Sequence, residues 1–193
     1  MGNRGILHND QRQIIRQFES YKSWVVCHTE FKGRTRTLMT PGSYTELFFL
    51  DEATAFAAGH RPCGECRRPW YRRFKEAWLA GNPQAGFALR PGIRLIDRYL
   101  HQDRLASGGT KRTHPATLRD LPGGTFVRPH DADDAYLLWC GRLYDWTPAG
   151  YDEMHPVEPC QVVEVLTPRS MVNAFSAGYK PVLHPSVMGP RGI

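Results

Sequence analysis

The sequence predicts an α+β fold in which helices precede a small β-rich module. Segments with helical apolar spacing or helix-capping residues dominate the chain up to residue 105. From Gly124 onward, short runs of β-branched and aromatic residues alternate with turn residues, a pattern typical of a small sheet or open barrel. We therefore expect an N-terminal module at residues 1–81, a helical connection at 82–122 and a β-rich module at 123–193.

Helices and short strands alternate in the N-terminal module. The elements expected there are a helix at 9–22, a strand at 24–27, a strand at 44–50, a helix at 51–58 and a helix at 69–80. Asn9 or Asp10 can cap the first helix. Asp51 can cap the second helix, which Gly59 ends. Pro69 suits the first turn of the third, so residues 60–68 form the turn between two helices.

The rest of the chain changes from helix to strand. A helix at 92–105 carries Ile93, Ile96 and Leu100 on a common face. The strands expected in the C-terminal module lie at 125–127, 135–139, 143–146 and 162–166. After them, the run Ala177-Gly178-Tyr179-Lys180-Pro181 repeats the pattern of Ala58-Gly59-His60-Arg61-Pro62. This echo indicates either a degenerate duplication or chance.

The motif with the clearest chemistry is Cys63-Gly64-Glu65-Cys66. Two thiolates three residues apart can converge on one tetrahedral ion, so the spacing favours metal binding, with zinc as the first choice. A redox pair is the alternative, but a thioredoxin-like site would start a helix directly after a buried strand. Five cysteines, an odd number, argue against a disulfide framework. Cys140 and Cys160 are expected to be structural thiols among strand residues.

The segment around this motif resembles the zinc-binding domain of the Ada family of DNA alkylation-response proteins. The matching residues are Phe48, Phe49, Ala57, Ala58, Gly59, Arg61, Pro62, Cys63, Cys66 and Arg67, and the likeness covers roughly residues 22 to 70. The family usually has a Cys-x-x-x-Cys before its Phe-Phe strand, whereas this chain offers only Cys27 there. The resemblance implies a zinc module that acts in DNA binding or repair.

The expected zinc ligands are Cys27, Cys63 and Cys66, with the fourth position open. His28 and His60 are the two histidine candidates for it, and a residue of another kind is also possible. Adjacent residues of a strand point in opposite directions, so Cys27 and His28 can ligate together only if the strand bends. The choice of fourth ligand therefore stays open from the sequence.

A rival interpretation uses the same cysteines for catalysis. His28-Thr29-Glu30, followed by Pro62-Cys63-Gly64-Glu65-Cys66, satisfies the H-x-E and P-C-x-x-C pattern of zinc-dependent cytidine and adenosine deaminases. In that interpretation His28, Cys63 and Cys66 bind zinc, and Glu30 transfers the proton. The local structure disagrees, since the deaminase histidine opens a helix whereas His28 ends a predicted strand.

A second catalytic possibility lies between the two halves. Lys111, Thr113 and His114 follow a flexible Gly-Gly, and His101 and Asp103 lie in the preceding helix, so together they could act as acid, base or nucleophile. The alternative is that all are surface residues at a helix–loop junction.

The charge distribution indicates a polyanionic partner. Residues 1–80 hold 13 Lys and Arg against 8 Asp and Glu, whereas residues 81–193 hold 12 against 11. A basic field beside the metal motif favours nucleic acid, DNA in particular, although it could serve solubility alone. The residues expected to contact phosphates are Arg34, Arg36, Arg67, Arg68, Arg72 and Arg73. A zinc-stabilised scaffold for a protein partner is the third interpretation.

Length and hydropathy set the remaining expectations. A chain of 193 residues, 41% of them hydrophobic, can bury a substantial core. Its apolar runs fall short of the roughly 20 residues that cross a bilayer, and the first residues lack the apolar core of a signal peptide. We therefore expect no membrane partner and a cytoplasmic location.

Overall fold

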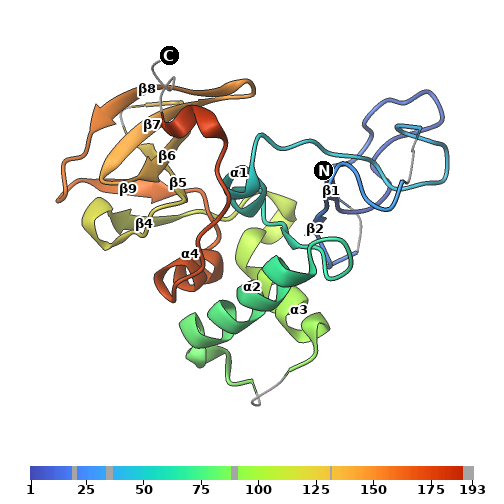
Figure 1. The fold of residues 1–193 in the computed structure, drawn as a ribbon, viewed down its shortest axis with the longest axis horizontal. Coiled ribbons are helices and arrows are strands. Elements are labelled where there is room, and N and C mark those ends of the chain that lie inside the picture. The colour runs from blue at the N-terminus through green and yellow to red at the C-terminus, as the bar shows by residue number, and fades with distance from the viewer. Residues whose placement is uncertain (19–20, 34–36, 88–90, 131, 189–193) are drawn as a thin grey trace.

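The computed structural model describes residues 1–18, 21–33, 37–87, 91–130 and 132–188 (Figure 1). It contains both helices and sheets, which confirms the α+β class. The α-helices are α1 (Glu52–Ala57), α2 (Arg68–Gly81), α3 (Ile93–Arg104) and α4 (Arg169–Ser176). Short 3₁₀ turns cover Pro83–Ala85, Ser107–Gly109, Leu118–Asp120 and Pro185–Met188.

The strands form two sheets of different size. A three-stranded sheet has the order β1 (Gly2–Asn3), β2 (Val25–Val26), β3 (Arg61–Pro62), in which β2 and β3 are parallel. The six-stranded antiparallel sheet has the order β4-β9-β5-β6-β7-β8. Its strands are β4 (His114–Thr117), β5 (Thr125–Pro129), β6 (Tyr136–Trp139), β7 (Arg142–Thr147), β8 (Gly150–Pro156) and β9 (Val162–Val165).

Helix α1 begins and ends where its sequence predicts. The Asp51 carboxylate accepts a hydrogen bond from the backbone N–H of Thr54 at 2.8 Å, which caps the first turn. At the other end, Gly59 has a φ of +79° and donates to the carbonyl of Phe56, while His60 donates to that of Ala55. This pair of bonds is a Schellman motif, for which glycine is the favoured residue.

The helix expected at 9–22 was a wrong prediction as far as the chain is described. Residues 9–18 form turns and an isolated bridge, and residues 19–20 lie outside the described part. The Asn9 side chain accepts from the N–H groups of Gln11 and Gln13, which stabilises a local turn in place of a helix. Ile14 and Ile15 are 59% and 53% exposed, so these two side chains add no packing that would support a helix.

Two further expectations need correction. The strand predicted at 44–50 is reduced to one isolated bridge, between Leu47 and Gly2. Cys140 and Cys160 are exposed in turns that adjoin the strands, so they are not buried structural thiols. The strands expected in the C-terminal module are confirmed, while β4 and β8 were not anticipated.

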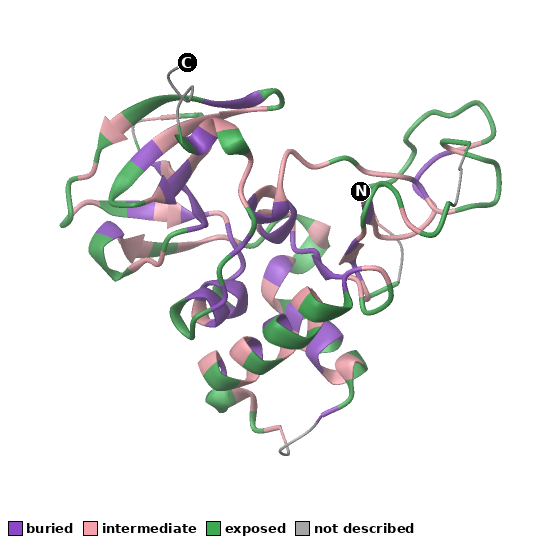
Figure 2. Cartoon of the chain, viewed as in Figure 1, coloured by how far each residue is buried: buried purple, intermediate pink, exposed green. Residues whose placement is uncertain are grey.

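One hydrophobic core joins all three predicted parts of the chain. It is built by α1, α2, α3, α4 and the turn after α4, and buried residues concentrate where these helices face one another (Figure 2). Its members are Phe56, Phe74, Trp78, Ile96, Leu100, Met171, Ala174, Phe175 and Tyr179. Ala53 of α1 also packs into the core of the six-stranded sheet. The borders predicted at 81/82 and 122/123 therefore do not separate independent cores.

Candidate metal centre

Three cysteine side chains from two distant segments meet at the ends of β2 and β3. The parallel register pairs Val25 with Arg61 and Val26 with Pro62, so the next residues along, Cys27 and Cys63, lie side by side. The backbone N–H of Cys63 donates to the Val26 carbonyl at 2.9 Å, which extends this pairing. The turn that leads into α2 then supplies Cys66.

The three sulfur atoms are close enough to share an ion. The Sγ atoms of Cys27, Cys63 and Cys66 all lie within 4.8 Å of one another, and each residue is partly buried. A tetrahedral ion with bonds of about 2.3 Å to sulfur separates its sulfur ligands by about 3.8 Å. The group could therefore hold a metal ion with small side-chain adjustments.

Hydrogen bonds among these thiols assign the first negative charge to Cys63. The Cys27 thiol donates to Cys63, and the backbone N–H groups of Cys66 and Glu65 also donate to it, so its pKa is lowered to about 5. The same Cys27–Cys63 bond, together with burial, raises the pKa of Cys27. Burial raises the pKa of Cys66. Loading a metal onto the group would release the remaining thiol protons.

The rings of the two candidate histidines are not part of the sulfur group, although the backbone N–H of His28 donates to the Cys66 thiol. The exposed His28 directs its ring toward Trp70, at 5.7 Å between ring centroids in an edge-on arrangement. The ring of His60 is fully buried between Phe49 and Trp24, with centroids 4.8 and 5.5 Å away. Neither ring belongs to the group of sulfur atoms, and no other His, Cys, Asp or Glu of the described residues joins it.

The arrangement expected for a deaminase is not assembled either. That interpretation requires the His28 ring and the thiols of Cys63 and Cys66 to bind one ion, with Glu30 beside it. The structure replaces the histidine by Cys27, and Glu30 is exposed.

The residues of the second catalytic possibility have separate partners. The Lys111 ammonium donates to the last turn of α1, and the Thr113 hydroxyl donates to Glu164 at 2.6 Å. The Asp103 carboxylate accepts from the first turn of α4, while His114 lies in β4. Asp103 lies near enough to His114 to oppose the lowering of its pKa by burial, but Lys111 and Thr113 bond to other groups, so the five residues do not act as one group.

The basic residues near the metal motif divide into buried and exposed sets. Arg67 is 9% exposed and pairs with Glu52 at 2.9 Å, so it stabilises the fold instead of facing solvent. Burial raises the pKa of Glu52, although Arg67 acts in the opposite direction. Arg68, Arg72 and Arg73 are exposed on α2. Arg34 and Arg36 lie outside the described residues.

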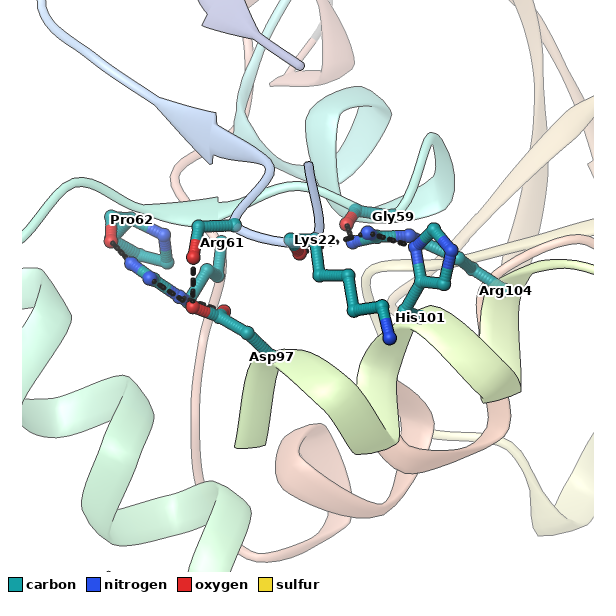
Figure 3. Close-up of polar contacts among 8 residues, drawn as sticks. Lys22, Gly59, Arg61, Pro62, Asp97, His101 and Arg104 are labelled. Atoms are coloured by element: carbon teal, nitrogen blue, oxygen red, sulfur yellow. Dashed lines mark hydrogen bonds and ion pairs between the residues drawn. The ribbon is translucent and has the colours of Figure 1, made fainter. Parts of the chain in front are cut away.

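A buried ion pair positions the segment that carries the motif. Arg61 donates from Nε and Nη2 to the two carboxylate oxygens of Asp97, at 2.6 and 2.8 Å (Figure 3). The hydroxyl of Ser23 donates to the same carboxylate at 2.5 Å. This pair fixes β3 on α3, directly before Cys63. Sequence reasoning missed Asp97, although a carboxylate next to Ile96 on an apolar helix face was a usable signal.

A second arginine of α3 holds the turns that precede the two strands. Arg104 is 3% exposed and donates to the carbonyls of Gly59 and Lys22, both at 2.9 Å (Figure 3). It also lies 2.8 Å from Nδ1 of His101. Helix α3 therefore contacts the segments before β2 and before β3 together, which supports the parallel pairing that aligns the cysteines.

Comparison with protein-family models, with curated proteins and with solved structures found no match. The likeness to the Ada zinc-binding domain thus depends on the residues quoted for it. Among the described residues, no helix combines the length and apolar composition needed to cross a membrane. The function is therefore inferred from the site itself.

Proposed function

We propose that this chain is a zinc-binding protein that binds nucleic acid, with DNA as the expected target. The observation that carries the proposal is the convergence of Cys27 with Cys63 and Cys66 from segments 36 and 39 residues apart. Sulfur-rich tetrahedral donor sets select zinc over the harder divalent ions. All five cysteines are unpaired, which suits a reducing compartment such as the cytoplasm.

The bound ion would stabilise a weak part of the fold. Strands β2 and β3 have two residues each, and strands this short contribute little stability by themselves. An ion shared by Cys27, Cys63 and Cys66 would link the ends of both strands to the first turn of α2. Binding free energy would then become folding free energy of the N-terminal segments.

Helix α2 supplies the surface for phosphates. Arg68, Arg72 and Arg73 are exposed on the side of α2 away from the buried Phe74 and Trp78. Positions 68 and 72 lie one helical turn apart, so their guanidinium groups can follow a phosphate backbone. The helix begins just after Cys66, so the metal would fix the position of this basic face. The resemblance to the Ada zinc-binding domain supports DNA in particular.

Metal content and X-ray absorption at the zinc edge test the metal site. We expect one zinc with three sulfur ligands in the wild type, and loss of one sulfur or of the ion in Cys27→Ser. Cys160→Ser is the matched control, because Cys160 is exposed and outside the group. One zinc with two sulfurs, unchanged in Cys27→Ser, would overturn the site and favour the deaminase interpretation.

Salt-dependent DNA binding tests the partner. The triple variant Arg68→Gln, Arg72→Gln, Arg73→Gln should bind a duplex oligonucleotide more weakly and reduce the slope of log affinity against log salt by about 0.9 for each lost phosphate contact. The control is Arg119→Gln with Arg142→Gln, two exposed arginines on the six-stranded sheet side. If the zinc-loaded protein binds no DNA, the nucleic-acid part is refuted and a protein-interaction scaffold is favoured.

A further inference from the structure

A pocket lined by cations lies at the opposite end of the β2–β3 pair from the cysteines. Trp24 and Ala58, which line the pocket, precede the two parallel strands, whereas Cys27 and Cys63 follow them. Its volume is about 240 Å³. The pocket is too small for most drug-sized ligands, which occupy roughly 300–1,000 Å³, but it can take one polar group with part of its carrier.

Three positive side chains from separate segments border this space: Arg4, Arg104 and Lys111. Arg4 and Arg104 lie near the ring of Trp24, with guanidinium carbons 5.0 and 3.6 Å from its centroid. In the part of the chain that the structure describes, neither buried Nε–H has a hydrogen-bond partner. Lys111 lines the pocket from the loop after α3, and its ammonium donates a hydrogen bond to the carbonyl of Ala57.

No carboxylate of the described residues lines the pocket or pairs with these three cations. The nearest acidic groups that influence them are already engaged. Both carboxylate oxygens of Asp97 accept hydrogen bonds from Arg61, and the Glu164 carboxylate accepts hydrogen bonds from Arg128 and Thr113. The positive charge of the pocket is therefore not compensated within the described part of the chain.

Carbonyl groups at the C-terminal end of α1 compensate only part of the positive charge in the pocket. Arg104 and Lys111 donate to the carbonyls of Gly59 and Ala57, which is the favourable position for cations at a helix C-terminus. Among the described residues, Arg4 makes no such contact with the end of α1. Burial, with Arg4 as a further cause, lowers the pKa of Lys111 to about 8 and that of Arg104 to about 9. Burial is the main cause of both shifts, and the positive charge of Arg4 adds to it.

We propose that this pocket binds a phosphate group. Arginine N–H groups suit phosphate oxygens, and the lysine adds a point charge to the same site. Three cations suit a dianion better than a single carboxylate. The ring of Phe18 lines the same pocket and offers an apolar contact to the group that carries the phosphate, which is a nucleotide or a nucleic-acid backbone. The proposal goes beyond the zinc site, since it involves neither the cysteines nor the basic face of α2.

Calorimetric titration of the full, zinc-loaded chain with inorganic phosphate at constant ionic strength tests the site. We expect saturable binding with one phosphate per chain, weakened at least tenfold in Arg4→Gln and in Lys111→Gln. The matched control is Arg98→Gln, an exposed arginine of α3 outside the pocket, which should bind as the wild type does. Circular dichroism and thermal unfolding check that the variants fold.

Absence of saturable binding, or equal weakening in all three variants, would overturn the proposal. Parallel titrations with a mononucleotide and a short single-stranded oligonucleotide identify the source of the phosphate: the tighter ligand of the two is the better match. The triple variant of α2 separates this site from the proposed function. If that variant loses DNA binding but keeps phosphate binding, the two sites are distinct, and if DNA never binds while phosphate does, only the proposed function fails.

Discussion

Replacing Asp97 by asparagine should destabilise the protein by about 3–5 kcal/mol, because it leaves the buried Arg61 guanidinium without a counter-charge. The side chains of Arg61 and Asp97 are 6% and 3% exposed, and two hydrogen bonds of 2.6 and 2.8 Å join them. The amide that replaces the carboxylate would keep one acceptor oxygen and place a donor group against a donor. That loss is a large fraction of the 5–15 kcal/mol by which most domains are stable.

Urea unfolding at fixed zinc concentration, followed by fluorescence and by circular dichroism, measures this effect. Asp120→Asn is the matched control, because it makes the same chemical change at a side chain that is 68% exposed and 4.0 Å from Arg119. Such surface pairs contribute about 0–1 kcal/mol. Equal destabilisation by the two substitutions would refute the reasoning that burial makes the Arg61–Asp97 pair decisive.

A double variant separates buried charge from lost packing. Arg61→Met combined with Asp97→Leu removes both charges and keeps apolar volume, so it should be less destabilised than Asp97→Asn. Because Arg61 directly precedes the motif segment Pro62-Cys63, the single variant should also bind zinc more weakly. If the double variant has a lower free energy of unfolding than Asp97→Asn, the pair stabilises the fold by more than the compensation of the Arg61 charge.

Two further predictions concern stability. Gly81→Ala should lower the free energy of unfolding by about 1–3 kcal/mol, because the new Cβ would lie 2.2 Å from the carbonyl oxygen of Asn173, where α2 crosses α4. Gly86→Ala is the control for packing, because the space around Gly86 is open. Its own cost comes from the positive φ of +64° at that position. The stability of the wild type should rise relative to Lys111→Met as the pH increases from about 8 toward 10.5. Burial, with Arg4 as a further cause and Glu164 opposing, lowers the pKa of the native Lys111, which therefore loses its proton before the unfolded one does. Urea unfolding of both proteins across this pH range measures it, and a constant difference would contradict a lowered pKa.

The elements that the sequence predicts correctly are those whose signals are local. Asp51 caps α1 through a hydrogen bond three residues away, and Gly59 ends it through a conformation that glycine adopts readily. The region around Ile14 shows the limit of this reasoning. Its apolar spacing is helical, but the structure places no partner surface against it, and the side chain of Asn9 stabilises a turn.

The candidate metal site was predictable in its sequence-local half. The spacing of Cys63 and Cys66 brings their sulfur atoms together within one turn, whereas Cys27 joins them only because β2 pairs with β3 in parallel. The environment of His60 depends on rings that packing brings to it from elsewhere in the chain. The position of His60 beside the motif in the sequence therefore could not show whether its ring is a metal ligand or a buried core residue.

The internal echo has a structural counterpart in the turn that ends α4. Gly178 donates to Phe175 and Tyr179 to Ala174, which is the same Schellman motif that ends α1. The aromatic residues of the two copies pack together, with Phe56 and Phe175 rings 5.3 Å apart.

The segments that follow the two Schellman motifs differ in their contacts within the chain. In the first copy, Cys63 pairs along β2 and faces Cys27. In the second, Val182 takes the place of Cys63, and its backbone N–H donates to the Glu52 carboxylate while its carbonyl accepts from the Glu52 N–H. The first copy thus carries the donor atoms, while the second fixes the start of α1, the helix whose far end leads into the metal motif.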